Sequence, residues 1–162
     1  MTTIRKEIVR SQRFTHPISL IVMDIDHFKE INDTYGHAAG DAAICVLANT
    51  CRTMARQIDI VARLGGDEFA VLLLEVDLEN ALTIAERIRS AVSKTPITGF
   101  GSQEICFTIS IGVAEQPAGN ISEEWLMERA DAAMYQAKVA GKNRTMASAP
   151  PSSQQLAKES AL

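Results

Sequence analysis

The chain has 162 residues, of which 46% are hydrophobic and 22% are charged. A chain of this length forms one domain and buries about two thirds of the surface that its unfolded state exposes. Its 16 basic and 20 acidic residues give a formal net charge of −4, which excludes a general electrostatic attraction to nucleic acid or to an anionic membrane. A ligand that carries phosphate must therefore be held by a local site.

Three cysteines, Cys45, Cys51 and Cys106, lie in apolar-periodic segments without CxxC spacing. Their odd number and their positions predict buried, reduced thiols, which favours the cytoplasm. The apolar runs at residues 18–23 and 69–74 have the length of strands and are too short to span a membrane. We therefore expect a domain that makes no membrane contact.

The first half of the chain predicts two helices around a buried strand. Residues 2–14 suit a helix that His16-Pro17 ends, because proline disfavours a helical residue before it. ISLIVMD, residues 18–24, is typical of a strand buried on both faces. A helix is expected between Asp41 and Ile58. Its apolar face is formed by Ile44, Leu47, Ala48, Cys51, Met54 and Ile58.

A hairpin and a second amphipathic helix come next. IDIVARL (58–64) and EFAVLLLE (68–75) are predicted strands, and the Gly-Gly pair between them is a hairpin signal. Apolar spacing over residues 78–92 predicts the helix, with Asp77 as its N-cap.

The last predicted elements are a strand over residues 104–114 (EICFTISIGVA) and a long helix. The helix begins at Ser122, where Ile121 and Leu126 occupy hydrophobic-staple positions, and it ends near Gly141. A short final strand is expected over residues 143–146.

This order of elements, β-α-β-β-α-β-α, predicts an α/β (α+β) fold with a mixed central sheet flanked by helices. The pattern is the split βαβ, or ferredoxin-like, type. We assign residues 1–146 to one domain. Residues 147–162, ASAPPSSQQLAKESAL, have the composition of a disordered tail.

The run RLGGDEFAVLLLE, residues 63–75, places two carboxylates on a tight turn before an apolar strand. If the first strand neighbours the hairpin, Asp24 and Asp67 meet at one edge of the sheet. Two close carboxylates repel unless a proton or a cation lies between them, and Mg²⁺ combines one or two carboxylates with waters and phosphate oxygens. Gly65 and Gly66 let backbone N–H groups approach such a phosphate, and Lys138 can supply positive charge.

Each of these features also has a simpler structural interpretation. The glycines suit any hairpin turn, and the acids suit any strand end or cap. Basic residues near Lys138 would stabilise a helix dipole without a ligand. Taken singly, the simpler interpretation is favoured for every feature, and only their combination favours a site.

Four blocks carry that combination. They are SLIVMDIDHFKEINDTYGHAAGD (19–41), ARLGGDEFAVLL (62–73), TISIGVA (108–114) and RADAAMYQAKVAGKNR (129–144). In content, order and spacing they resemble the GGDEF domains of diguanylate cyclases, from about residue 18 to residue 144. The family fold, related to nucleotidyl cyclase catalytic domains and polymerase palms, agrees with the predicted order of elements.

The resemblance implies a role for each matching residue. Asp24 and Asp67 match acids that bind Mg²⁺ or Mn²⁺, the carbonyl of Ile25 matches a backbone metal ligand, and Glu68 matches an acid that assists metal binding or activates the 3′-hydroxyl. The positions implied for phosphate binding are His27, Phe28, Lys29, Gly65, Gly66, Lys138 and Lys142.

Asn32 and Asp41 match the residues that recognise guanine. Guanine presents N1–H and its exocyclic amine side by side, so one carboxylate can accept both, with discrimination of about 1–3 kcal/mol. Adenine offers no such pair of donors. The simpler alternative is that Asp41 only caps a helix over residues 42–56.

The implied reaction condenses two GTP molecules to cyclic di-GMP and two pyrophosphates. One domain holds one GTP, so the resemblance implies a homodimer. Arg56 and Asp59 form an RxxD pattern with five residues between Asp59 and Gly65, which matches the family's product-inhibition site, and Arg87 matches a second arginine used there. A helix-end ion pair, worth ~0–1 kcal/mol, is the simpler alternative.

The sequence departs from the family pattern at its beginning. A segment resembling DxLTGLxNRR is expected before the first helix, and this chain starts inside the equivalent of that helix. A sensor or receiver domain usually precedes the cyclase domain. Beside an active cyclase, two alternatives stay open: a non-catalytic module that binds GTP or cyclic di-GMP, and a structural domain that binds no nucleotide.

Overall fold

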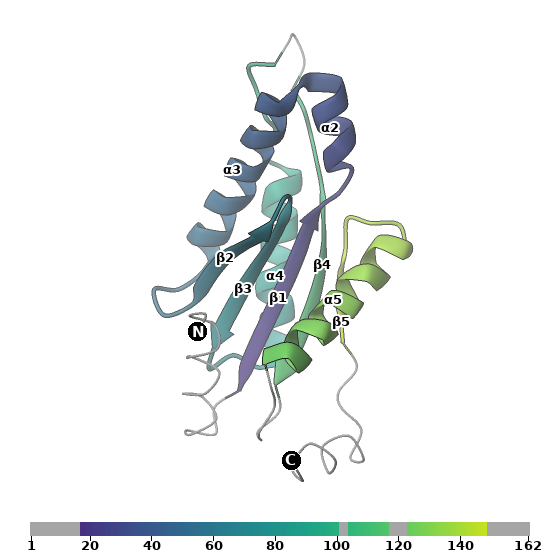
Figure 1. The fold of residues 1–162 in the computed structure, drawn as a ribbon. Coiled ribbons are helices and arrows are strands. Elements are labelled where there is room, and N and C mark those ends of the chain that lie inside the picture. Colours follow the sequence, from purple (N-terminus) through teal and green to yellow (C-terminus); the bar gives the residue numbers. More distant parts are fainter. Residues whose placement is uncertain (1–16, 101–103, 117–122, 149–162) are drawn as a thin grey trace.

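The computed structural model describes residues 17–100, 104–116 and 123–148. These residues form five strands and four helices, which confirms the mixed α/β class (Figure 1). The strands are β1 (Ile18–Ile25), β2 (Ile60–Gly65), β3 (Glu68–Leu74), β4 (Ile109–Gln116) and β5 (Thr145–Ala147). The helices are α2 (Phe28–Tyr35), α3 (His37–Met54), α4 (Leu78–Ser93) and α5 (Glu123–Val139).

The sheet has the order β2-β3-β1-β4-β5, in which β4 and β5 are parallel and the other neighbours are antiparallel. Every residue of the central strand β1 is buried, as its continuous apolar run predicts. Side chains of α2, α3 and α4 pack on one face of the sheet and those of α5 on the other, so Figure 1 has α5 in front and α4 behind.

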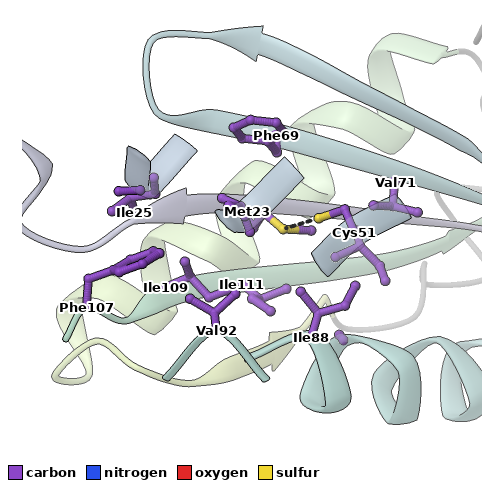
Figure 2. Packing of buried hydrophobic residues seen from close by; sticks show 14 of the residues in the cluster. Met23, Ile25, Cys51, Phe69, Val71, Ile88, Val92, Phe107, Ile109 and Ile111 are labelled. Atoms are coloured by element: carbon purple, nitrogen blue, oxygen red, sulfur yellow. Dashed lines mark hydrogen bonds between the residues drawn. The ribbon is translucent and has the colours of Figure 1, made fainter. Parts of the chain in front are cut away.

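The larger core lies between the sheet and helices α3 and α4 (Figure 2). Within it the Cys51 thiol lies 3.6 Å from the sulfur of Met23. Burial raises the pKa of Cys51 to about 12, so this thiol stays uncharged, and its predicted burial is confirmed. The same prediction is wrong for Cys45 and Cys106, which are exposed. Cys45 lies on the solvent side of α3, and Cys106 separates two buried residues of an extended segment.

Helix α3 and strand β4 differ from the prediction in where they begin or end. Helix α3 begins at His37 instead of Asp41, because Gly36 (φ +86°) separates it from α2, and it ends at Met54, before the extended Ala55. Ile58 is therefore outside the helix and is 54% exposed. The strand expected from residue 104 begins at Ile109. Before it, Ile105 forms an isolated bridge with Ile97.

Three local predictions are confirmed. The carboxylate of Asp77 caps α4 by accepting the N–H of Asn80 at 2.9 Å. Helix α5 ends at Val139, shortly before Gly141, whose φ of +112° suits glycine. The short final strand is present as β5.

Some predictions fall outside the described residues: the helix over residues 2–14, and Ser122 and Ile121 at the start of the last helix. Ordered structure extends slightly into the predicted tail, because Ala147 belongs to β5 and the N–H of Ser148 donates to the carbonyl of Val113 at 2.8 Å. Residues 149–162 are not described. Among the helices that are, none has the length and apolar character needed to cross a membrane.

We expect Gly112→Ala to destabilise the domain by about 1–3 kcal/mol or more, measured by urea unfolding. A Cβ at Gly112, in β4, would collide with the carbonyl oxygen of Ala130 and the backbone nitrogen of Met134 in α5. Backbone atoms of a packed helix cannot turn aside. Gly65→Ala is the matched control, since nothing lies within 4 Å of its added carbon. Equal stability of the two variants would contradict this account of the sheet–helix contact.

Candidate functional site

The acidic residues of the hairpin turn lie beside the end of β1. Asp24 of β1 is paired with Glu68, the first residue of β3. The carbonyl of Asp67, in the turn, accepts the N–H of Ile25 at 3.4 Å. Strand β1 therefore neighbours the hairpin, as the sequence argument required, and Figure 1 shows the hairpin tip beside the end of β1.

Opposing effects act on the carboxylate of Asp24. Burial raises its pKa, the hydrogen bond and charge of Lys138 lower it, and the negative charges of Asp67 and Glu68 raise it; the net result is a raised pKa. The Nζ of Lys138 lies 2.9 Å from Oδ2 of Asp24. The ammonium group of Lys138 thus pairs with Asp24, whose carboxylate also feels the negative charges of Asp67 and Glu68.

A further acid of this corner, Asp131 on α5, was missed by the sequence analysis. Asp131 is exposed, and partial desolvation together with the negative charge of Glu68 raises its pKa. Asp131 and Lys138 lie about two helical turns apart, so α5 turns both toward the same acidic edge. This spacing within RADAAMYQAK is the signal that could have identified it.

The donor set at this corner fits a hard cation only together with a phosphate ligand. Within residues 17–100, 104–116 and 123–148, no three His, Cys, Asp or Glu side chains could hold a metal ion among themselves. Mg²⁺ commonly takes one or two carboxylates and completes its shell with waters and phosphate oxygens. Asp24 and Asp67 offer those carboxylates, and the carbonyl of Ile25 is adjacent in sequence.

The residues predicted to bind phosphate come from three segments. His27 (φ +57°) and Phe28 lie where α2 begins, and the first N–H groups of a helix lack partners inside it and favour anions. The side chain of Lys29 is exposed in the first turn of α2. Gly65 ends β2, and Gly66 (φ +49°) lies in the hairpin turn.

Lys142 follows α5 in the left-handed region, with φ +61°, and its N–H donates to the carbonyl of Ala137 at 3.0 Å. Gly141 bonds back to the carbonyl of Lys138 at 3.3 Å. The two lysines therefore flank one compact turn. Whether they bind phosphate stays a prediction.

The buried carboxylate of Asp26, just after β1, joins three segments. It accepts the hydroxyls of Thr108 at 2.7 Å and Ser110 at 2.6 Å, and the backbone N–H of Asn143 at 3.0 Å. These bonds fasten the turn that contains Lys142 to the end of β1. Asp26 thus positions residues of the site without belonging to the acidic edge.

The two predicted guanine-binding residues lie on neighbouring helices. Asn32 is in α2 and is partly buried, whereas Asp41 is in α3 and is exposed. Asp41 lies inside α3, which begins at His37, so the interpretation that Asp41 caps this helix is wrong.

The RxxD residues form a turn between α3 and β2. The carboxylate of Asp59 accepts the N–H of Arg56 at 2.7 Å and that of Leu74 at 3.2 Å. Among the described residues no ion pair joins the side chains of Arg56 and Asp59, which removes the simpler interpretation as a surface ion pair. The side chains of Arg56 and Arg87 are exposed.

We expect Asp24→Asn to stabilise the domain at pH 7. The folded-state pKa of Asp24 is raised above 3.8, so its favourable neutral form is fully present below pH 3.8 and is lost as pH rises through the raised pKa. Asparagine stays neutral and can still accept from Lys138. The free energy of unfolding, measured across pH 3–8, should show a gain that grows with pH.

Asp33→Asn is the control, since Asp33 is an exposed acid of α2. It should show no comparable gain. A loss of stability in Asp24→Asn at pH 7 would mean that the ion pair with Lys138 outweighs burial and repulsion.

Comparison with known proteins connects this geometry to a family. The family model described as "Diguanylate cyclase, GGDEF domain" matches residues 1–144. The chain is 47% identical over 129 residues to diguanylate cyclase DgcM of Escherichia coli, and 42% identical over 134 residues to response regulator PleD of Caulobacter vibrioides. These alignments cover 80% and 82% of this chain but only 30% of each relative.

A solved structure gives the same result. The GGDEF domain of DgcB from Caulobacter crescentus, determined in complex with c-di-GMP, superposes with a TM-score of 0.84 at 35% identity. The match covers 90% of this chain and 85% of that one. With the family match, the sequence identities and the structural superposition in agreement, the chain belongs to the diguanylate cyclase GGDEF domain family.

Proposed function

We propose that this domain condenses two GTP molecules to cyclic di-GMP and two pyrophosphates. The observation that carries the proposal is the corner where Asp24, Asp67 and Glu68 meet, with Nζ of Lys138 2.9 Å from Asp24. At such a corner the phosphates of a polyphosphate would pair with the ammonium group of Lys138, and its bound cation would pair with the carboxylates.

Asp24, Asp67 and the carbonyl of Ile25 would hold Mg²⁺ or Mn²⁺, which when bound neutralises phosphate charge and orients the reacting oxygens. The 3′-oxygen of each GTP attacks the α-phosphorus of the other. Each attack forms one phosphodiester bond, breaks the bond to the β-phosphate and releases pyrophosphate. The carboxylate of Glu68 is suited to accept the proton of the 3′-hydroxyl.

The remaining residues bind and orient the triphosphate. Gly65 and Gly66 carry no side chain that would keep backbone N–H groups from the α-phosphate. His27 and Phe28 offer the first N–H groups of α2, and Lys138 and Lys142 supply positive charge. Lys29, exposed in the same helical turn, adds a further cation.

One acidic corner per domain implies that two domains face each other during catalysis, since each supplies one GTP. The relatives named above are about three times longer than the matched region. We propose that in the whole protein a sensor or receiver domain brings two cyclase domains together in the cytoplasm. A non-catalytic module that binds GTP or cyclic di-GMP is the alternative.

Formation of cyclic di-GMP from GTP and Mg²⁺ should rise more steeply than linearly with protein concentration. Where most of the protein is monomeric, doubling its concentration should raise the rate about fourfold, because mass action governs pairing. Asp67→Ala should lower the rate by about 100-fold or more, because an oxygen ligand of the cation is lost. No product at any concentration, together with thermal stabilisation by cyclic di-GMP, would favour the non-catalytic alternative.

We also propose that cyclic di-GMP binds at Arg56, Asp59 and Arg87 and restrains the enzyme. Arg56→Ala should weaken product binding about 10- to 100-fold in calorimetry, the range for losing a charged hydrogen-bond donor to phosphate. Arg52→Ala, an exposed arginine in the last turn of α3, is the matched control. Equal affinity of the two variants would exclude Arg56 from the product site.

A further inference from the structure

Gly40 is a glycine in a place where the backbone does not require one. It is buried within α3, and its φ is not in the left-handed region. A glycine inside a helix is less favourable than alanine by about 0.5–1 kcal/mol. A reason for glycine must therefore come from what lies against it.

The carboxamide of Asn32 fills the space that a side chain at position 40 would need. A Cβ on Gly40 would collide with Oδ1 of Asn32, and it would lie 2.9 Å from Cγ and 3.2 Å from Nδ2 of the same side chain. The collision involves only the end of one polar side chain. At Gly112, by contrast, an added carbon would meet helix backbone.

An added methyl group at Gly40 would therefore displace Asn32 and leave the helices in place. Rotation of Asn32 about its side-chain bonds reaches another staggered conformer, which carries the carboxamide away from α3.

We propose that Gly40 is a positioning residue for base recognition. It seats the carboxamide of Asn32 beside the start of α3, next to Asp41, so that the two polar groups face one base together. An amide both donates and accepts, whereas a carboxylate only accepts, so the pair can match the mixed donor and acceptor edge of guanine. This inference rests on the proposed function of the domain.

The first test uses Gly40→Ala without nucleotide. Its Tm should not fall, because alanine favours the helix. The side-chain amide resonance of Asn32, identified by its absence in Asn32→Ala, should move in the NMR spectrum. An unmoved resonance would overturn the proposal, because the amide would not depend on the space at Gly40.

The second test is kinetic. The KM for GTP should rise about threefold to tenfold in Gly40→Ala, more than kcat falls, which corresponds to losing one or two hydrogen bonds. Binding of ATP with Mg²⁺, which uses the phosphates, should stay within about twofold. In the Asn32→Ala background Gly40→Ala should add nothing, because no carboxamide is left to displace.

The outcomes separate this proposal from the proposed function. A moved resonance with an unchanged KM for GTP would overturn the role of Gly40 while the cyclase assignment stands. If the unmodified domain makes no cyclic di-GMP, the cyclase assignment fails by itself. Calorimetric binding of GTP then decides about Gly40, and an equal Kd in Gly40→Ala would overturn its role.

Discussion

Strand β1 is hydrogen-bonded to β3 on one side and to β4 on the other, and its whole length is buried. Because side chains alternate across a strand, Leu20 and Val22 join the core under α5, while Ile21 and Met23 join the core under α3 and α4. Asp24 continues the first series. The alternation therefore brings it to the face of α5, where Lys138 lies, and a register shift of one residue would separate this pair.

That placement gathers negative charge at the acidic corner. The repulsion opposes folding, and a bound cation would relieve it. Burial and the charges of Asp67 and Glu68 raise the pKa of Asp24, and Glu68 acts in the same direction on Asp131. Lys138 offsets only part of this. A cation that binds only the folded state would stabilise it, and relief of this unfavourable charge would add to its affinity.

Two acids separated by one residue have different roles because their surroundings supply different partners. Asp26 receives three donors, from Thr108, Ser110 and the backbone of Asn143, which makes it a buried structural anchor. Asp24 receives one ammonium group and faces other carboxylates. In the sequence DID the two residues are chemically identical. Only the segments packed against each of them make Asp26 a structural anchor and Asp24 a candidate ligand.

The sequence alone determined the elements whose pattern is local. A continuous apolar run specifies β1, a Gly-Gly turn between two strands specifies the hairpin, and Asp77 marks the start of α4. Tertiary structure alone decided which residues come near one another: the charge of Glu68 acts on Asp131, and the carboxamide of Asn32 lies against Gly40. Periodicity records which face of an element is apolar. It does not show which residue of another element packs against that face, because that contact depends on how separate elements pack.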